Sequence, residues 1–188
     1  MRVGFIGLRR VLGVMLVLVA GIVFLLLGTS SAAGQYPMDV VPKVTVESGG
    51  SLSITGGTTG TNTIDFGNMG PGTFKEKTLS LGITANNAWH LTVSKNQDLS
   101  DSVILAMIPS VNFTFKSNGD AGPNYATSDT QFGTSVSPSN VATNGLATGS
   151  SNVNVVYKLV MPGDQPCNNP AVSYYSAVHT YTLIVGSP

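Results

Sequence analysis

Apolar and polar residues alternate along the chain after its first 33 residues, and no window there repeats with the period of a helix. Alternation puts successive side chains on opposite faces of an extended segment, and the valine, threonine, isoleucine and aromatic residues present suit a pleated sheet. Glycine, asparagine and proline mark turns between the segments. The pattern predicts strands over 40–46, 51–54, 63–66, 74–84, 89–95, 103–108, 111–116, 153–160 and 174–185.

These segments indicate an all-β protein, and we expect an immunoglobulin-like β-sandwich of about eight strands with Greek-key connections. A single open sheet of this size would leave one apolar face in water. Residues 117–151 are rich in serine, threonine, asparagine and glycine, so we expect a long loop with one short strand there. No repeat or linker divides the sandwich.

The first 33 residues have a different pattern, in which basic residues precede an uncharged run from Val11 to Leu27 and small residues come after it. That order is typical of a signal-peptide helix, and we expect cleavage before Gly34. The run is a little long for a cleaved signal and a little short for a full membrane span, so a retained anchor stays open. We expect a secreted, cell-surface protein that meets a membrane only through an uncleaved N-terminal segment.

Charge and cysteine content change the picture further. All three arginines lie before residue 34, which leaves six lysines against nine acidic residues, a net charge of −3. A weakly acidic chain without arginine lacks the basic surface that binds phosphate backbones, so nucleic acid is not expected as a partner. Cys167 is the one cysteine, which excludes an intramolecular disulfide and leaves a free thiol or an intermolecular bridge.

Residues 34–50 form a separate N-terminal segment before the sandwich proper, which we place at 51–188. Pro42 marks its strand as an edge strand, and Gly49 and Gly50 separate it from the strand expected over 51–54. The N-terminal strand either packs in its own sandwich or completes a neighbouring subunit by strand addition, as in a filament or pilus. The candidate donor residues are Val40, Val41, Val44 and Val46.

Residues 89–94, Trp-His-Leu-Thr-Val-Ser, resemble the Trp-x-Leu signature of the WxL cell-surface domains of Gram-positive bacteria. That family has a second Trp-x-Leu near its C-terminus, and here Tyr181-Thr182-Leu183 stands in the matching place, with tyrosine for tryptophan. The resemblance covers roughly residues 64–185. It implies a β-sandwich that attaches non-covalently to peptidoglycan or another cell-wall polymer.

The residues themselves support a simpler role for the motif. Trp89 and Leu91 lie two apart on a strand and so share a face, as do Tyr181 and Leu183. Large inward side chains of this kind hold two sheets together, each aromatic burying roughly 150–250 Å². We therefore expect these four residues in the core, with wall contact through Trp89 as the alternative.

Candidate catalytic groups are few, and we expect no enzyme, metal or cofactor. No zinc-type cluster and no Gly-x-Ser-x-Gly elbow is present. His90 should point away from the core. His179 shares the inward face of its strand, so we expect either a hydrogen-bonded structural histidine or a bulge that turns it outward.

Two acidic stretches are interpreted as ordinary turns. Asp120, in Ser117-Asn118-Gly119-Asp120, is the one charged group of a possible calcium loop that would also use Asn124, and its spacing matches no known calcium site. Asp98 and Asp101 lie close together, as glycosidase carboxylates can, but they are expected as solvated acids between strands. The chain is therefore interpreted as a non-catalytic structural or binding protein of the bacterial cell surface, with a pilus-like subunit as the alternative.

Overall fold

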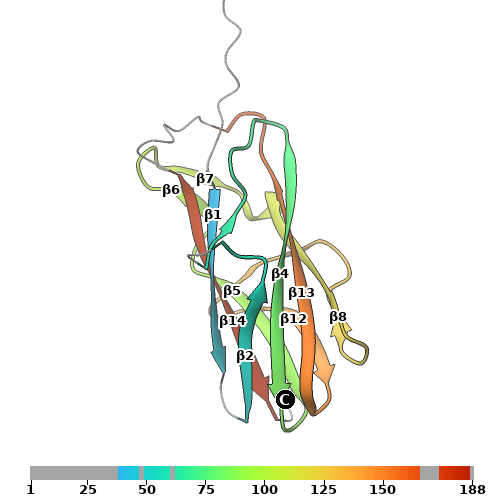
Figure 1. Cartoon of the computed structure of the whole chain (residues 1–188). Coiled ribbons are helices and arrows are strands. Elements are labelled where there is room, and N and C mark those ends of the chain that lie inside the picture. Colours follow the sequence, from blue (N-terminus) through green and yellow to red (C-terminus); the bar gives the residue numbers. More distant parts are fainter. Residues whose placement is uncertain (1–37, 47–48, 60–61, 166–173, 187–188) are drawn as a thin grey trace, which may run out of the picture. The chain divides into compact units, whose positions relative to one another are not determined.

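The computed structural model describes residues 38–46, 49–59, 62–165 and 174–186. The described chain is almost entirely β-structure arranged in two sheets, which confirms the all-β sandwich class (Figure 1). A single turn of 3-10 helix covers Ser110–Asn112. The expected signal peptide and Cys167 lie outside the described residues.

One sheet has five antiparallel strands. Its long central strands pair over eleven register positions, from Thr148 opposite Ala85 to Val160 opposite Phe74. The spatial order is β10 (Thr130–Gln131), β8 (Phe113–Gly119), β13 (Thr148–Val160), β4 (Phe74–Ala85) and β2 (Gly50–Gly56).

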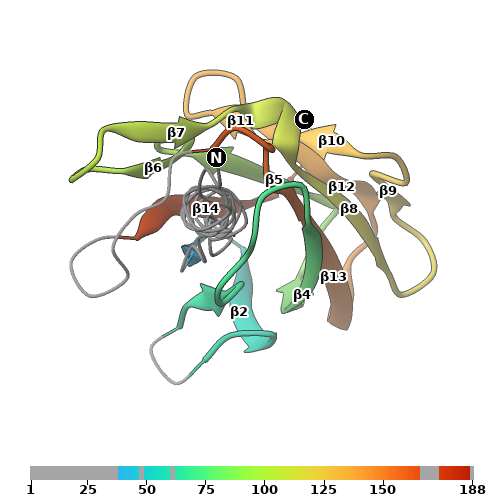
Figure 2. The ribbon, with the colours of Figure 1, turned by 90° about the horizontal axis from the view of Figure 1, so that it is seen from above.

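The other sheet faces it, as the view along the strands shows (Figure 2). Its main path is β3 (Ile64–Asp65), β1 (Met38–Val46), β14 (Tyr175–Val185), β5 (Trp89–Lys95), β12 (Ser139–Gly145) and β9 (Asn124–Tyr125). Three short strands join it off this path: β11 (Gly133–Thr134) on β5, β6 (Leu99–Asp101) on β14, and β7 (Ala106–Ile108) on β6.

The N-terminal strand β1 lies in this second sheet and is parallel to β14, the last strand of the chain. The two pair over nine positions, from Met38 opposite Tyr175 to Val46 opposite Leu183. On its other side β1 is covered by β3, but only at Asp39 and Val40. The predicted edge strand is therefore an inner strand at its start and an edge strand beyond Val40.

The core fills the space between the two sheets and draws on inward residues of both. Strands β4, β5, β13 and β14 supply most of it through the alternation seen in the sequence. Fully buried members include Leu79, Leu81, Leu91, Val93, Val153, Val155, Tyr157, Leu159, Tyr181 and Leu183. Every described core residue lies between Met38 and Leu183.

Two stretches differ from the sequence prediction. Residues 117–151 contain four short strands, β9 to β12, together with the end of β8 and the start of β13, rather than a long loop with one strand. Few side chains between residues 120 and 147 are buried, Phe132, Val141 and Ala142 among them, so no apolar alternation reveals these strands. The strand predicted over 103–108 is a hairpin arm covering only 106–108, because residues 102–105 form its turn.

Candidate binding surface around Trp89

The four motif residues lie together on two neighbouring strands. In the antiparallel register of β5 and β14, Leu91 is opposite Leu183, and Trp89 is opposite Val185. Leu91, Tyr181 and Leu183 are fully buried, and Trp89 is 2% exposed. The motif is thus part of the sandwich interior, as the alternation of apolar and polar residues predicted.

Trp89 is held at the end of the sandwich by the turn after β12. Its indole Nε1 donates a hydrogen bond to the carbonyl oxygen of Leu146 at 2.9 Å. Gly145 lies against the indole so closely that a Cβ there would be 2.1 Å from the ring atom Cε2. Asn144 before it has a left-handed φ of 57°, which brings the chain over the ring. The Asn-Gly dipeptide is a turn signal in the sequence, but its contact with Trp89 is visible only in the fold.

Two clefts flank this tryptophan. The larger, about 330 Å³, is lined by Ala88, Trp89, His90, Asn140, Thr143 and Asn144, with Gly186. The smaller, about 190 Å³, lies between Trp89, the turn around Asp120 and Pro123, and the β12–β13 connection at Leu146. His90 is half-buried on the face of β5 opposite the core, as predicted, and contributes to the wall of the larger cleft.

The larger cleft is lined by neutral hydrogen-bonding groups beside an aromatic residue. Each asparagine amide offers two donors and an acceptor, and the threonine hydroxyl offers both functions. Such a set suits a neutral polyhydroxylated ligand better than an anion, since no lysine or arginine lines it. Among the described residues no cluster of three or more His, Cys, Asp or Glu could hold a metal ion.

His179 lies in the interior with neither ring nitrogen hydrogen-bonded, so the expected hydrogen-bonded histidine is wrong. Its ring is 4.0 Å from that of Phe132 and stacks on Tyr157 at 5.5 Å and 14° (centroid distances and interplanar angle). Burial, followed by the charge of Lys95, lowers the pKa of His179 to about 3. The register with β1 and β5 runs through this position without a bulge, so the ring cannot turn outward.

The other polar side chains of this interior are paired. The hydroxyl of Tyr181 lies 2.7 Å from that of Tyr157, and burial raises the pKa of both phenols. The amide of Gln165 donates to the hydroxyl of Tyr175 at 2.6 Å. Ser117 Oγ donates to the carbonyl of Val141 and accepts from the N–H of Ala126. His179 therefore stands apart from its buried polar neighbours.

The acidic residues have structural partners. Asp101 is buried rather than solvated, and its Oδ1 accepts the N–H groups of Val103 at 2.8 Å and Ile104 at 3.2 Å. Asp98 binds Lys95 and Ser110; burial raises the pKa of its carboxyl, but these hydrogen bonds outweigh burial and lower it.

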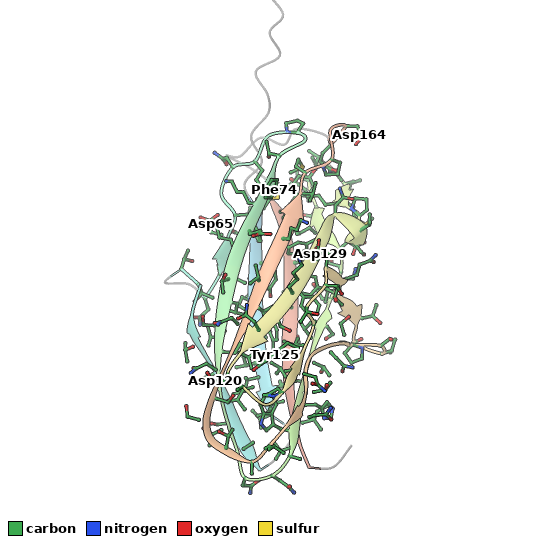
Figure 3. The ribbon with its side chains drawn as sticks, turned by 90° about the vertical axis from the view of Figure 1, so that its right-hand side faces the viewer. Asp65, Phe74, Asp120, Tyr125, Asp129 and Asp164 are labelled. Atoms are coloured by element: carbon green, nitrogen blue, oxygen red, sulfur yellow. The ribbon has the colours of Figure 1, made fainter. Side chains whose placement is uncertain are left out.

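Asp120 pairs with the backbone of Asn152 and lies toward the opposite end of the sheet from Phe74 (Figure 3). Its Oδ2 accepts the Asn152 N–H at 2.7 Å. These contacts place the 117–120 stretch at the end of β8 and in the turn that follows it.

Comparison with known proteins adds little. No protein-family model matches the chain, and no curated protein matches it. Among solved structures, a family 123 glycoside hydrolase from Clostridium perfringens aligns with a TM-score of 0.32 and 10% identity, over 80% of this chain and 24% of that one. The chain thus spans about a quarter of that enzyme's length, and a likeness this weak carries no argument. In the described part of the chain, no helix is long and apolar enough to span a membrane.

Proposed function

We propose that this protein is a non-catalytic, extracellular structural or binding module of the bacterial cell surface, associated with the cell wall in the manner of WxL domains. The scaffold is an immunoglobulin-like sandwich with Greek-key connections. The supporting observation is that Trp89 and Leu91 on β5 and Tyr181 and Leu183 on the neighbouring β14 are all buried, with Leu91 opposite Leu183, and that Trp89 also lines the larger cleft.

Binding is assigned to the cleft beside Trp89 rather than to the ring of Trp89 itself. The ring is almost wholly buried, and its N–H is already bonded to Leu146. His90, Asn140 and Asn144 present the polar atoms of the cleft wall. Their hydrogen-bond donors and acceptors match the hydroxyl and acetamido groups of glycan strands such as those of peptidoglycan.

The test is a pelleting experiment with purified peptidoglycan sacculi. The protein without residues 1–33 should sediment with sacculi, and the double variant His90→Ala/Asn140→Ala should bind roughly tenfold more weakly, the loss expected for two or more hydrogen bonds. Ser53→Ala on β2, an exposed polar change in the other sheet, is the matched control. Failure of the wild type to sediment, or equal sedimentation of the double variant, would contradict the assignment.

A second candidate, a filament subunit that assembles by strand addition, is favoured by one observation on β1. This strand is held chiefly by β14, and its outer edge lacks a β-ladder partner among the described residues beyond Val40. Val40 is buried, Val41 and Val44 are half-buried, and Val46 is 36% exposed. The segment therefore occupies a place beside β14 in its own chain that a neighbour's segment would also fit.

Deletion of residues 35–46 separates the two arrangements. Strand donation predicts that polymers disappear while the sandwich stays folded whenever a β1 peptide is supplied in trans. If β1 serves only its own sandwich, no polymers form in the wild type, and the deletion unfolds the domain because nine ladder positions on β14 lose their partner.

A further inference from the structure

The hairpin of β6 and β7 presents apolar side chains on both of its faces. Residues Val103 to Ile108 are six consecutive apolar residues. Ile104 and Ala106 pack against the core and Ile108 is buried, whereas Val103, Leu105 and Met107 are 59%, 87% and 58% exposed. An ordinary surface hairpin would carry polar residues on that outer face. The exposed apolar side chains therefore mark this face as a binding surface.

The turn of the hairpin is fixed rather than loose. The buried carboxylate of Asp101 accepts two backbone N–H groups of the turn, from Val103 and Ile104. Leu105 has a φ of 54°, a left-handed conformation that is rare for a residue with a large side chain. The chain therefore holds its most exposed leucine outward at a cost in backbone strain.

Exposed apolar side chains gather at this end of the sandwich. Ser100 in β6 is opposite Ser176, next to the pair Met38 and Tyr175, so the hairpin lies where β1 and β14 begin (Figure 1). Phe74 is labelled near Asp164 at this end in Figure 3. Besides the three hairpin residues, the large exposed apolar residues here are Phe74, Val111 and Tyr174.

The place where the chain enters the sandwich indicates the occupant of this surface. Ten residues, 28–37, separate the end of the uncharged run from Val11 to Leu27 from Met38, the first residue of β1. Ten extended residues reach at most about 33–36 Å. A leader retained as an anchor would therefore be joined to the hairpin end of the sandwich by a connection of at most that length.

We propose that the outer face of the β6–β7 hairpin, Val103, Leu105 and Met107, inserts into the surface of the membrane to which a retained leader would anchor the chain. Residues 99–112 contain no lysine or arginine, so attraction is apolar and does not depend on anionic lipid. Phe74 and Tyr174 supply the aromatic rings that favour the headgroup region. Such insertion needs the chain to meet a membrane and is independent of wall binding at Trp89.

Environment-sensitive labels on the full chain in phosphatidylcholine vesicles test the insertion directly. In a Cys167→Ser background, a fluorophore on Leu105→Cys should shift to the blue and be quenched by lipid-borne quenchers. The control is Leu146→Cys, which is 74% exposed at the Trp89 end and should report water. A label at 105 that reports water, or equal quenching at both positions, overturns the proposal.

A second experiment removes the leader at the cleavage site expected before Gly34. Residues 34–188 should float with phosphatidylcholine vesicles, and Val103→Ser, Leu105→Ser and Met107→Ser should each lower the partition coefficient about tenfold. Binding that requires phosphatidylglycerol would overturn the apolar mechanism. If the wild type instead forms dimers that the Leu105→Ser variant lacks, and does not float, the surface joins two copies and the lipid proposal is wrong.

Discussion

The half of the sandwich around Trp89 and the half around the β6–β7 hairpin differ in how completely their side chains are packed and hydrogen-bonded. Around Trp89 the largest ring is 2% exposed, its N–H is bonded, and a glycine makes room for it. Toward the hairpin a leucine is 87% exposed in a strained conformation, and His179 is buried with no hydrogen bond.

This contrast separates residues that hold the fold from residues that cost stability. Local rules are broken in proteins mostly where function requires it, and the cost is carried by well-packed regions elsewhere. Substitutions around Trp89 should therefore destabilise the protein. Near the hairpin, substitutions that relieve the left-handed strain at Leu105 or remove the unpaired polar group of His179 should stabilise the protein. Those that remove an exposed apolar side chain should also weaken the binding that the exposed surface provides.

The largest expected effect is the loss of Trp89. Trp89→Ala removes a buried indole and leaves a cavity under the β12–β13 turn, which should lower the free energy of unfolding by about 3–5 kcal/mol. Circular dichroism during urea titration measures it, because Trp89 is the only tryptophan and its fluorescence is lost. The control Leu146→Ala, at an exposed side chain of the same turn, should change stability by under about 0.5 kcal/mol. A loss below about 1 kcal/mol for Trp89→Ala would show that the ring is not part of the core.

Gly145→Ala should come next, at about 3 kcal/mol. The added Cβ would meet the indole at 2.1–2.5 Å, and moving the ring away would break the hydrogen bond from its N–H to Leu146. Thermal unfolding of this variant should be compared with that of Gly149→Ala, where a Cβ meets nothing within 4 Å. Equal unfolding temperatures would mean that the turn yields and that Trp89 is loosely held.

Acid should destabilise the folded protein through His179, which lies in the half toward the hairpin. Its pKa of about 3 in the folded protein is below the ordinary 6.5, so its neutral form contributes stability that is complete above pH 6.5 and is lost as the pH falls toward 3. At a slope of about 1.4 kcal/mol per pH unit, unfolding at pH 5 should cost about 2 kcal/mol less than at pH 7. Urea titrations at the two pH values measure the difference.

The matched pair for this prediction is His179→Leu and His90→Ala. The first should remove most of the pH dependence and, by eliminating a buried unpaired polar group, raise stability at pH 7 by about 1–3 kcal/mol. The second removes the half-buried histidine of the cleft instead and is the control for the loss of an imidazole. A pH dependence that survives in His179→Leu would assign it to other groups.

Much of this fold could be predicted because the long strands carry clear alternation. β5 lies at Trp89–Lys95 as the sequence indicated, and β4 and β14 match the predicted ranges to within one residue, whereas β13 begins at Thr148 rather than at the predicted Val153. The short strands between β8 and β13 could not be found, since their residues are polar and they owe their ladders to neighbours distant in sequence, as when β11 joins β5. A hydrophobic pattern in the sequence indicates which side chains are buried, and these short strands bury few of theirs.

The site was harder to predict than the fold. The inward placement of Trp89 and Leu91 follows from alternation, but the cleft beside them depends on Asn140 and Asn144, which come from a stretch interpreted as loop. The predictions for the surroundings of Asp101 and His179 were wrong for the same reason. Whether a polar side chain is paired depends on tertiary neighbours, here the N–H groups of a tight turn for Asp101 and a set of aromatic rings for His179.

The smallest effect expected is at Leu105, and it tests the contrast most directly. Asparagine accepts a left-handed φ far more readily than leucine, so Leu105→Asn should relieve strain and raise the free energy of unfolding by about 0.5–1 kcal/mol. The exposed leucine loses few contacts on replacement, because its side chain is 87% in solvent. Met107→Asn, on the same face without a left-handed φ, is the control and should give no such gain. If Leu105→Asn is more stable but binds vesicles less tightly, the strain at this position is retained for the surface it presents; if it is less stable, Leu105 has a packing role that its exposure conceals.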